Sequence, residues 1–135
     1  MRIAIGSDEE GPLVSTVVGH LRRHGHQVFV VAVPEPWPEV GRAVGAAVAE
    51  GRADLGVVCC WTGTGVSIAA NKVAGVRAAL CGDAVTADGA RRWNDANVLA
   101  LSIRTTTEAL ASEILDAFLA GRPDPDEAAL ISTLE

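Results

Sequence analysis

Short apolar runs alternate with longer amphipathic segments along almost the whole chain. Five of these runs are rich in Val, Ile, Leu or Ala and are bounded by polar or glycine residues, which predicts buried β-strands. The strands are expected at residues 2–6, 27–33, 54–60, 76–81 and 97–102. Several of the segments between them place apolar residues three or four positions apart, the spacing of a helix with one buried face.

Helices are therefore predicted at residues 11–24, 39–50, 66–72, 83–93 and 105–120, followed by a short terminal helix at 126–134. Pro12 is tolerated in the first turn of the first helix, and Gly121 is expected to cap the fifth. Strand–helix alternation with right-handed crossovers predicts an α/β, Rossmann-like three-layer sandwich around a five-stranded parallel sheet. With the strand order 2-1-3-4-5, ligands would bind between the first and third strands.

Length, composition and charge narrow the class of protein. The chain has 135 residues, of which 49% are hydrophobic, enough for one core. We expect a single domain over residues 1–135, with a C-terminal tail at about 122–135. A net charge of −6 without a basic stripe argues against nucleic acid as a partner. No signal-peptide pattern follows Met1 and no apolar run approaches membrane-spanning length, so we expect a cytoplasmic protein without a membrane partner.

The three cysteines are too few for a disulfide framework and lack the CxxC spacing of metal sites, so reduced thiols are expected. Cys59 and Cys60 are neighbours in one strand and must point to opposite faces of the sheet. At most one of them can therefore face a ligand. Cys81 ends another apolar run and is expected in the core.

Cys60 is followed by a glycine-rich loop, Trp61-Thr62-Gly63-Thr64-Gly65. Such a backbone lets amide N–H groups converge on a bound oxygen or anion, and Ser67 is expected to open the helix behind the loop. A thiol beside these donors suggests proton or acyl chemistry, and a buried structural cysteine is the alternative. The sheet order places Ser7-Asp8-Glu9 beside this loop. Asp8 is either part of the site or, as is commoner for Asp before a helix, an N-cap.

Two familiar glycine motifs do not fit the chain. Residues 63–68 begin like a dinucleotide fingerprint but have Ile68 where a third glycine is required. Residues 6–11 have the spacing of a P-loop but continue into Pro12-Leu13. We expect neither NAD nor ATP, and no other cofactor. The histidines lie on or just after the first helix, where we expect surface residues and no metal site: His20, His24 and His26.

Four blocks of sequence together resemble the type B ribose-5-phosphate isomerases and their galactose-6-phosphate isomerase relatives. They are Gly6-Ser7-Asp8 and residues 60–72, 75–81 and 94–99, in the same order as in the family. The resemblance runs from Arg2 to about Gly121. It implies interconversion of aldose and ketose phosphates through an enediolate, without a metal. It also implies a homodimer, or a dimer of dimers, with shared active sites.

The resemblance also implies roles for individual residues. Cys60 would be the base that moves a proton between adjacent carbons, and the loop from Trp61 to Gly65 would hold the developing oxyanion. Thr62 would place a hydroxyl near the substrate, and Asn94 would orient it. The residues expected to contact the carbohydrate substrate are Asp8, Glu9, Trp61, Gly63, Thr64, Gly65, Ser67, Trp93, Asn94 and Arg104.

Several positions depart from the family pattern. Glu9 replaces a histidine, Trp61 replaces a glycine, and Trp93 replaces the histidine that helps to open the sugar ring. Each tryptophan either contacts the ligand or fills space. The phosphate-binding arginines are reduced to Arg104, whose alternative role is a salt bridge with the following helix, and to Arg122 as a further candidate. These changes predict an altered, even unphosphorylated, sugar-like substrate, and a non-catalytic binding homologue is the alternative function.

Asn94 and Cys60 belong to opposite ends of the predicted sheet. Asn94 precedes the last strand, whereas Cys60 ends its own strand, and a strand of five or six residues spans roughly 17–20 Å. A second subunit is therefore expected to supply Trp93 and Asn94 to the Cys60 site.

Overall fold

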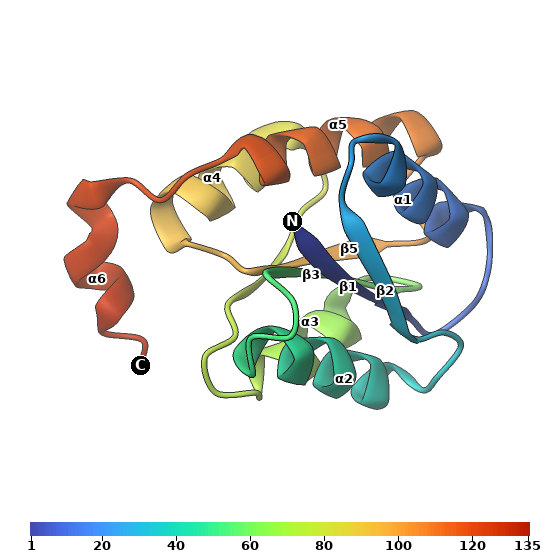
Figure 1. The fold of residues 1–135 in the computed structure, drawn as a ribbon, viewed down its shortest axis with the longest axis horizontal. Helices are drawn as coiled ribbons and strands as arrows, with labels where there is room; N and C mark the ends of the chain where they lie inside the picture. Colours follow the sequence, from blue (N-terminus) through green and yellow to red (C-terminus); the bar gives the residue numbers. More distant parts are fainter.

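A five-stranded parallel sheet forms the centre of the protein, whose computed structural model describes residues 1–135 (Figure 1). The strands are β1 (Arg2–Ser7), β2 (Gln27–Ala32), β3 (Leu55–Cys60), β4 (Ala78–Leu80) and β5 (Val98–Ser102). They lie in the order β2-β1-β3-β5-β4, and every neighbouring pair is parallel. The predicted α/β Rossmann-like class is confirmed.

The predicted strand order 2-1-3-4-5 is wrong at one edge of the sheet. β5 pairs with β3 from Gly56 beside Val98 to Cys60 beside Ser102, and β4 lies outside it. All five residues of β5 are buried, whereas the three residues of β4 are half-buried or exposed. The longer apolar strand therefore occupies the interior, and the short strand forms the edge. As a result, the end of β5 lies directly beside Cys60.

Helices cover both faces of the sheet. Those of the body are α1 (Pro12–Arg23), α2 (Trp37–Ala49), α3 (Thr64–Asn71), α4 (Ala84–Asn94) and α5 (Glu108–Ala120). α1, α4 and α5 lie on one face, and α2 and α3 lie on the other (Figure 1). Each face has its own buried cluster, and Cys59 belongs to the first while Cys60 belongs to the second. The expectation that these two side chains point to opposite faces is confirmed.

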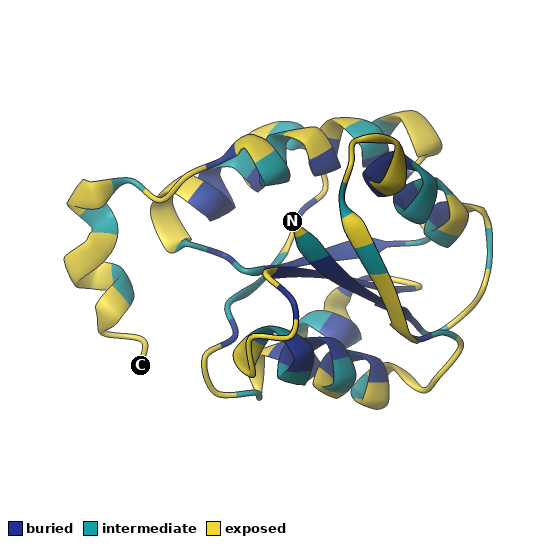
Figure 2. Ribbon diagram, viewed as in Figure 1, coloured by how far each residue is buried: buried dark blue, intermediate teal, exposed yellow.

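The chain ends in a 3₁₀ turn (Pro125–Glu127) and α6 (Ala128–Ser132), which lie apart from the two helical layers (Figure 1). Most of this segment is exposed, in contrast to β1, β3 and β5, which are buried almost throughout (Figure 2). Leu130 and Leu134 are among its exposed side chains. None of the helices has the length and apolarity needed to cross a membrane.

Three helices of the body, α2, α3 and α5, begin two or three residues away from the expected position, because local capping decides the first turn. α3 begins at Thr64, two residues early, since Gly63 adopts a left-handed conformation and forms its N-cap. α2 begins at Trp37, with a proline in its first turn. α5 begins at Glu108, because the Thr107 hydroxyl accepts the N–H of Leu110 at 3.1 Å.

Candidate active site

The Cys60 loop leaves the carboxyl end of β3 and is fastened to the end of β5. The Cys60 carbonyl accepts the N–H of Ile103 at 2.9 Å. The Trp61 carbonyl accepts both the hydroxyl of Ser102 and the N–H of Arg104, each at 2.9 Å. These bonds hold the loop backbone in place without any ligand, which is the condition for preorganised donors.

Glycine is required at two positions of the loop. Gly63 has φ of 78°, and a Cβ there would lie 2.5 Å from Leu80 Cδ1 and 3.0 Å from the carbonyl carbon of Leu101. A Cβ on Gly65 would lie 2.9 Å from the ring of Trp37. The loop therefore passes close to the end of β5 on one side and to an aromatic ring on the other.

The amino end of α3 offers free hydrogen-bond donors next to Cys60. Its N-cap makes no side-chain hydrogen bond, and no acceptor of the chain takes the N–H groups of residues 64–66. The hydroxyls of Thr62 and Thr64 bond to each other at 2.7 Å instead. Ser67 does not open the helix as expected but lies in its first turn, where its N–H donates to the Gly63 carbonyl at 3.3 Å. Free N–H groups at the positive end of a helix are suited to an anion.

Asp8 lies beside the end of β3, as the sequence predicts. Its N–H donates to the carbonyl of Cys59 at 3.2 Å. It is not an N-cap, because Gly11 occupies that position in α1 and no side chain caps the helix. Oδ1 of Asp8 is buried without a hydrogen-bond partner, and burial together with neighbouring Glu9 raises the pKa of this carboxyl. An unpaired buried oxygen at this position is an available acceptor for a ligand hydroxyl.

Glu9 is exposed, and its backbone is bound to Ser7. The Ser7 hydroxyl donates to the Glu9 carbonyl at 2.7 Å and accepts the Glu9 N–H at 3.3 Å. Glu9 also borders a hollow of about 60 Å³ that contains Ile103. Glu9 therefore lies on the side of α1.

A pocket of about 290 Å³ opens at the carboxyl ends of β4 and β5. It is lined by Thr62, Leu80, Cys81, Gly82, Ser102, Arg104 and Thr105. Arg104 is exposed and takes part in none of the ion pairs of the structure, so the predicted alternative of a pair with the following helix is not formed. Its guanidinium is free to bind an anion in this pocket.

The three tryptophans are all substantially exposed: Trp61 by 57%, Trp93 by 53% and Trp37 by 45%. Neither Trp61 nor Trp93 fills space in the core of this chain. Trp37 is not among the predicted site residues, yet its ring lies against Gly65. An aromatic residue between two prolines was the available signal, since rigid aromatic surfaces are typical of ligand sites.

Trp93 and Asn94 do not lie near Cys60. Gly56 is paired with Val98, and Cys60 lies four residues further along β3, about 13 Å away at the usual rise per residue. Asn94 precedes Val98 and lines a different cavity, of about 540 Å³, beside the C-terminal residues. A single chain therefore does not bring the predicted site residues together.

The rest of the block after Asn94 stabilises the local backbone. Asp95 has a left-handed φ of 46° and forms an ion pair with Arg77 at 3.2 Å. Asn97 accepts the N–H of Arg77 at 2.7 Å and donates to the Gly75 carbonyl at 2.9 Å. The Asn94 side chain makes none of these bonds and is exposed.

Cys60 is expected to react with iodoacetamide before the other two thiols. Burial raises the pKa of Cys59 to about 12 and that of Cys81 to about 11, so neither is a thiolate at neutral pH. Cys60 is slightly exposed, at 5%, and lies beside the free donors of α3. Mass spectrometry of fragmented peptides after brief labelling measures the order of reaction. Denatured protein is the control, and equal labelling of Cys59 and Cys60 in the native protein would contradict the assignment.

Comparison with known proteins places the chain among sugar-phosphate isomerases. Residues 3–130 match the Ribose/Galactose Isomerase family. The chain is 40% identical to galactose-6-phosphate isomerase subunit LacB of Clostridium acetobutylicum over 93% of this chain and 75% of the relative. It is 36% identical to D-erythrulose-4-phosphate isomerase of Pectobacterium atrosepticum, over 88% and 82% of the two chains. Ribose-5-phosphate isomerase B of Clostridium thermocellum has the same fold, with a TM-score of 0.92 and 38% identity over 99% of this chain and 95% of that one.

Proposed function

Because the chain belongs to the ribose/galactose isomerase family, we propose that it interconverts the aldose and ketose forms of a short sugar phosphate at the Cys60 loop. The predicted reaction class agrees with that of all three relatives, each named as a sugar-phosphate isomerase. The alternative of a non-catalytic homologue receives no support from them. The observation that most favours turnover is the row of free N–H groups that follows Cys60 at the start of α3.

The chemistry needs a base and a stabilised oxyanion. The Cys60 thiolate takes the proton from C2 of the aldose, and the electron pair moves onto the carbonyl oxygen to form a cis-enediolate. The N–H groups at the start of α3 bind this oxyanion, and each such donor can contribute roughly 3–4 kcal/mol. The proton then returns to C1, while the proton of the C2 hydroxyl passes to the oxygen on C1. No electrons are lost or gained overall.

Asp8 and Arg104 support binding at the two ends of the substrate. The unpaired Oδ1 of Asp8 accepts a substrate hydroxyl next to the reacting carbons. Arg104 binds the phosphate in the pocket shared with Thr62. With a single free guanidinium in this pocket, phosphate binding is weaker than a cluster of arginines would provide.

The substrate is shorter than a hexose phosphate. Within one chain, the pocket beside Arg104 has a volume of about 290 Å³, just below the ~300–1,000 Å³ range of small-molecule sites. Trp61 directly follows Cys60 and is exposed, and the ring of Trp37 lies against Gly65, so two aromatic side chains border the loop. We assign a four-carbon sugar phosphate, the kind of substrate for which a relative from Pectobacterium is named.

Ribose 5-phosphate is therefore expected to be a poor substrate, with kcat/KM below the ~10⁴–10⁸ M⁻¹s⁻¹ of ordinary enzymes. A panel of tetrose, pentose and hexose phosphates, assayed beside the free sugars, measures this directly. Trp61→Gly restores the residue typical of the family and is expected to raise the activity on ribose 5-phosphate relative to that on tetrose phosphate. Efficient turnover of ribose 5-phosphate by the unchanged protein would overturn the assignment, and turnover of no sugar would overturn the proposed function.

The active site is completed by a second subunit in a homodimer. Trp93 and Asn94 are exposed at the end of α4, near the amino ends of the strands, whereas Cys60 lies at the carboxyl end of its strand. Arg122 lies just after α5, where it donates to the carbonyls of Leu119 and Gly121 at 3.3 and 3.0 Å. A two-fold axis can place the end of α4 of one chain against the Cys60 loop of the other.

A further inference from the structure

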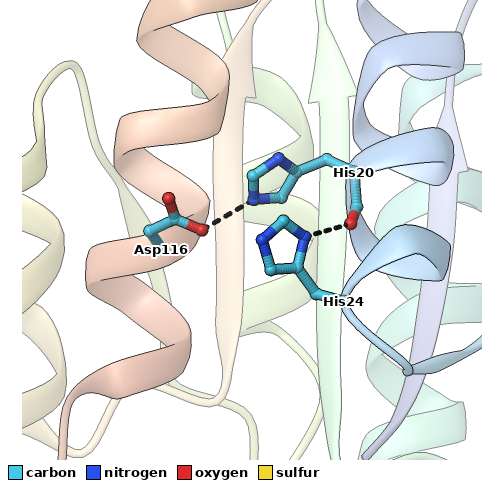
Figure 3. A group of neighbouring side chains, drawn as sticks. All are labelled: His20, His24 and Asp116. Atoms are coloured by element: carbon cyan, nitrogen blue, oxygen red, sulfur yellow. Dashed lines mark hydrogen bonds and ion pairs between the residues drawn. The ribbon is translucent and has the colours of Figure 1, made fainter.

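Two histidines and an aspartate form a cluster between α1 and α5, outside the candidate active site (Figure 3). His20 lies in the last turn of α1, His24 is the residue that ends the helix, and Asp116 comes from α5. Nε2 of His20 lies 2.7 Å from Oδ1 of Asp116. The two imidazole rings are stacked with their centroids 4.3 Å apart. Because α1 begins at the carboxyl edge of the sheet, its last turn lies toward the opposite edge, away from Cys60.

His20 is not the surface residue that its sequence position suggests. It is only 5% exposed, because it lies on the face of α1 that packs against α5. His24 and Asp116 are exposed. The cluster thus combines one side chain that packing holds in a fixed orientation with two that can still rotate.

The distances within the cluster suit a metal ion. One ligand atom from each residue can be chosen so that all three lie within 4.8 Å of one another. Around a tetrahedral Zn²⁺, with bonds of about 2.1 Å, ligand atoms lie about 3.4 Å apart. Rotation of the exposed His24 and Asp116 side chains can close this difference, while His20 keeps its position.

The hydrogen bond of His24 leaves the required lone pair free. Nδ1 of His24 lies 2.7 Å from the carbonyl oxygen of His20 (Figure 3). A carbonyl oxygen can only accept, so Nδ1 carries the proton and Nε2 of the neutral ring has an unshared pair. Metal-binding histidines are typically oriented in this way, with the second ring nitrogen donating to a backbone carbonyl or a carboxylate.

We propose that His20, His24 and Asp116 bind a divalent cation of the Zn²⁺ type and thereby link α1 to α5. Two imidazole nitrogens and one carboxylate oxygen are a donor set that suits Zn²⁺, and imidazole also suits Ni²⁺. The ion would replace the hydrogen bond between His20 and Asp116 with one coordinate bond to each. Its distance from the Cys60 loop makes it a structural ion that takes no part in the isomerisation.

Titration of tag-free protein with Zn²⁺, followed by calorimetry and by thermal unfolding, tests the site. We expect one ion per chain and a higher Tm with Zn²⁺ than with a chelator. His24→Gln and Asp116→Asn each remove one ligand at an exposed position, so the fold should persist. Each is expected to weaken binding at least about tenfold. His26→Gln is the matched control, because Nδ1 of this third histidine lies 3.0 Å from the amino group of Met1 and it is not one of the three ligands; its binding should be unchanged.

Co²⁺ identifies the ligands independently. With nitrogen and oxygen donors its spectrum shows visible d–d bands without the strong near-ultraviolet band of a thiolate complex. That band, or loss of binding after alkylation of Cys60, would move the ion to the cysteines and overturn the proposal. The proposal is equally overturned if Zn²⁺ binds more weakly than about 100 μM, if either ligand variant binds as the unchanged protein does, or if His26→Gln abolishes binding.

Discussion

Replacing Cys60 by alanine is expected to lower kcat by about 10²–10⁴-fold on the best substrate of the sugar-phosphate panel, because the base that takes the proton from C2 is lost. The side chain is small and the loop carbonyls accept the N–H of Ile103 and the hydroxyl of Ser102, so the oxyanion donors should stay in place. KM should therefore change little. Steady-state kinetics and incorporation of deuterium from D₂O into the sugar measure both the rate and the proton transfer.

Cys59→Ala is the matched control, since it removes the same chemical group one residue earlier. Its side chain points to the other face of the sheet, into the cluster that contains α1, α4 and α5. It should retain the kcat of the unchanged protein with a small loss of stability. If Cys60→Ala turns over normally, or if folded Cys59→Ala loses as much activity, the assignment of Cys60 as the base is wrong.

The second large effect is expected from mixing two inactive proteins. Cys60→Ala lacks the base and Asn94→Ala lacks the group that orients the substrate. In a mixed dimer, the intact Cys60 of one chain meets the intact Asn94 of the other and forms one complete site. With random pairing, half of the dimers are mixed and each has one working site of two, so about a quarter of the normal activity should return.

Co-expression with two different affinity tags, followed by removal of the tags, isolates the mixed dimers. Mixing Cys60→Ala with itself under two tags controls for effects of the procedure. If the site lay within one chain, each site of a mixed dimer would still carry one defect and no activity would return. Lack of rescue in isolated mixed dimers, or a fully active monomer, would contradict the shared site.

The succession of strands and helices along the chain could be predicted from the sequence because local periodicity determines each element. The positions of β4 and β5 within the sheet could not be predicted, since both runs are apolar. The choice between an interior and an edge position depends on how much apolar surface each strand buries. The boundaries at Thr64 and Glu108 depend on caps, at Gly63 and Thr107, that the apolar pattern does not reveal.

In the candidate site, too, some features could be predicted from the sequence and others could not. Cys60 and Asp8 could be brought together from sequence, because parallel strands place their carboxyl ends at one edge. The contact of Trp37 with Gly65 could not, because it depends on how α2 packs beside α3. The pairing of His20 with Asp116 joins residues 96 positions apart and leaves no local trace in the sequence.

The alternation of Cys59 and Cys60 across the sheet also has a consequence for oxidative damage. Cys81 belongs to the same buried cluster as Cys59, so both remaining thiols are separated from Cys60 by the sheet itself. A sulfenic acid formed on Cys60 therefore has no internal thiol with which to close a disulfide. Its repair depends on an external thiol such as a small reductant, and without one further peroxide would convert it irreversibly to the sulfinic acid.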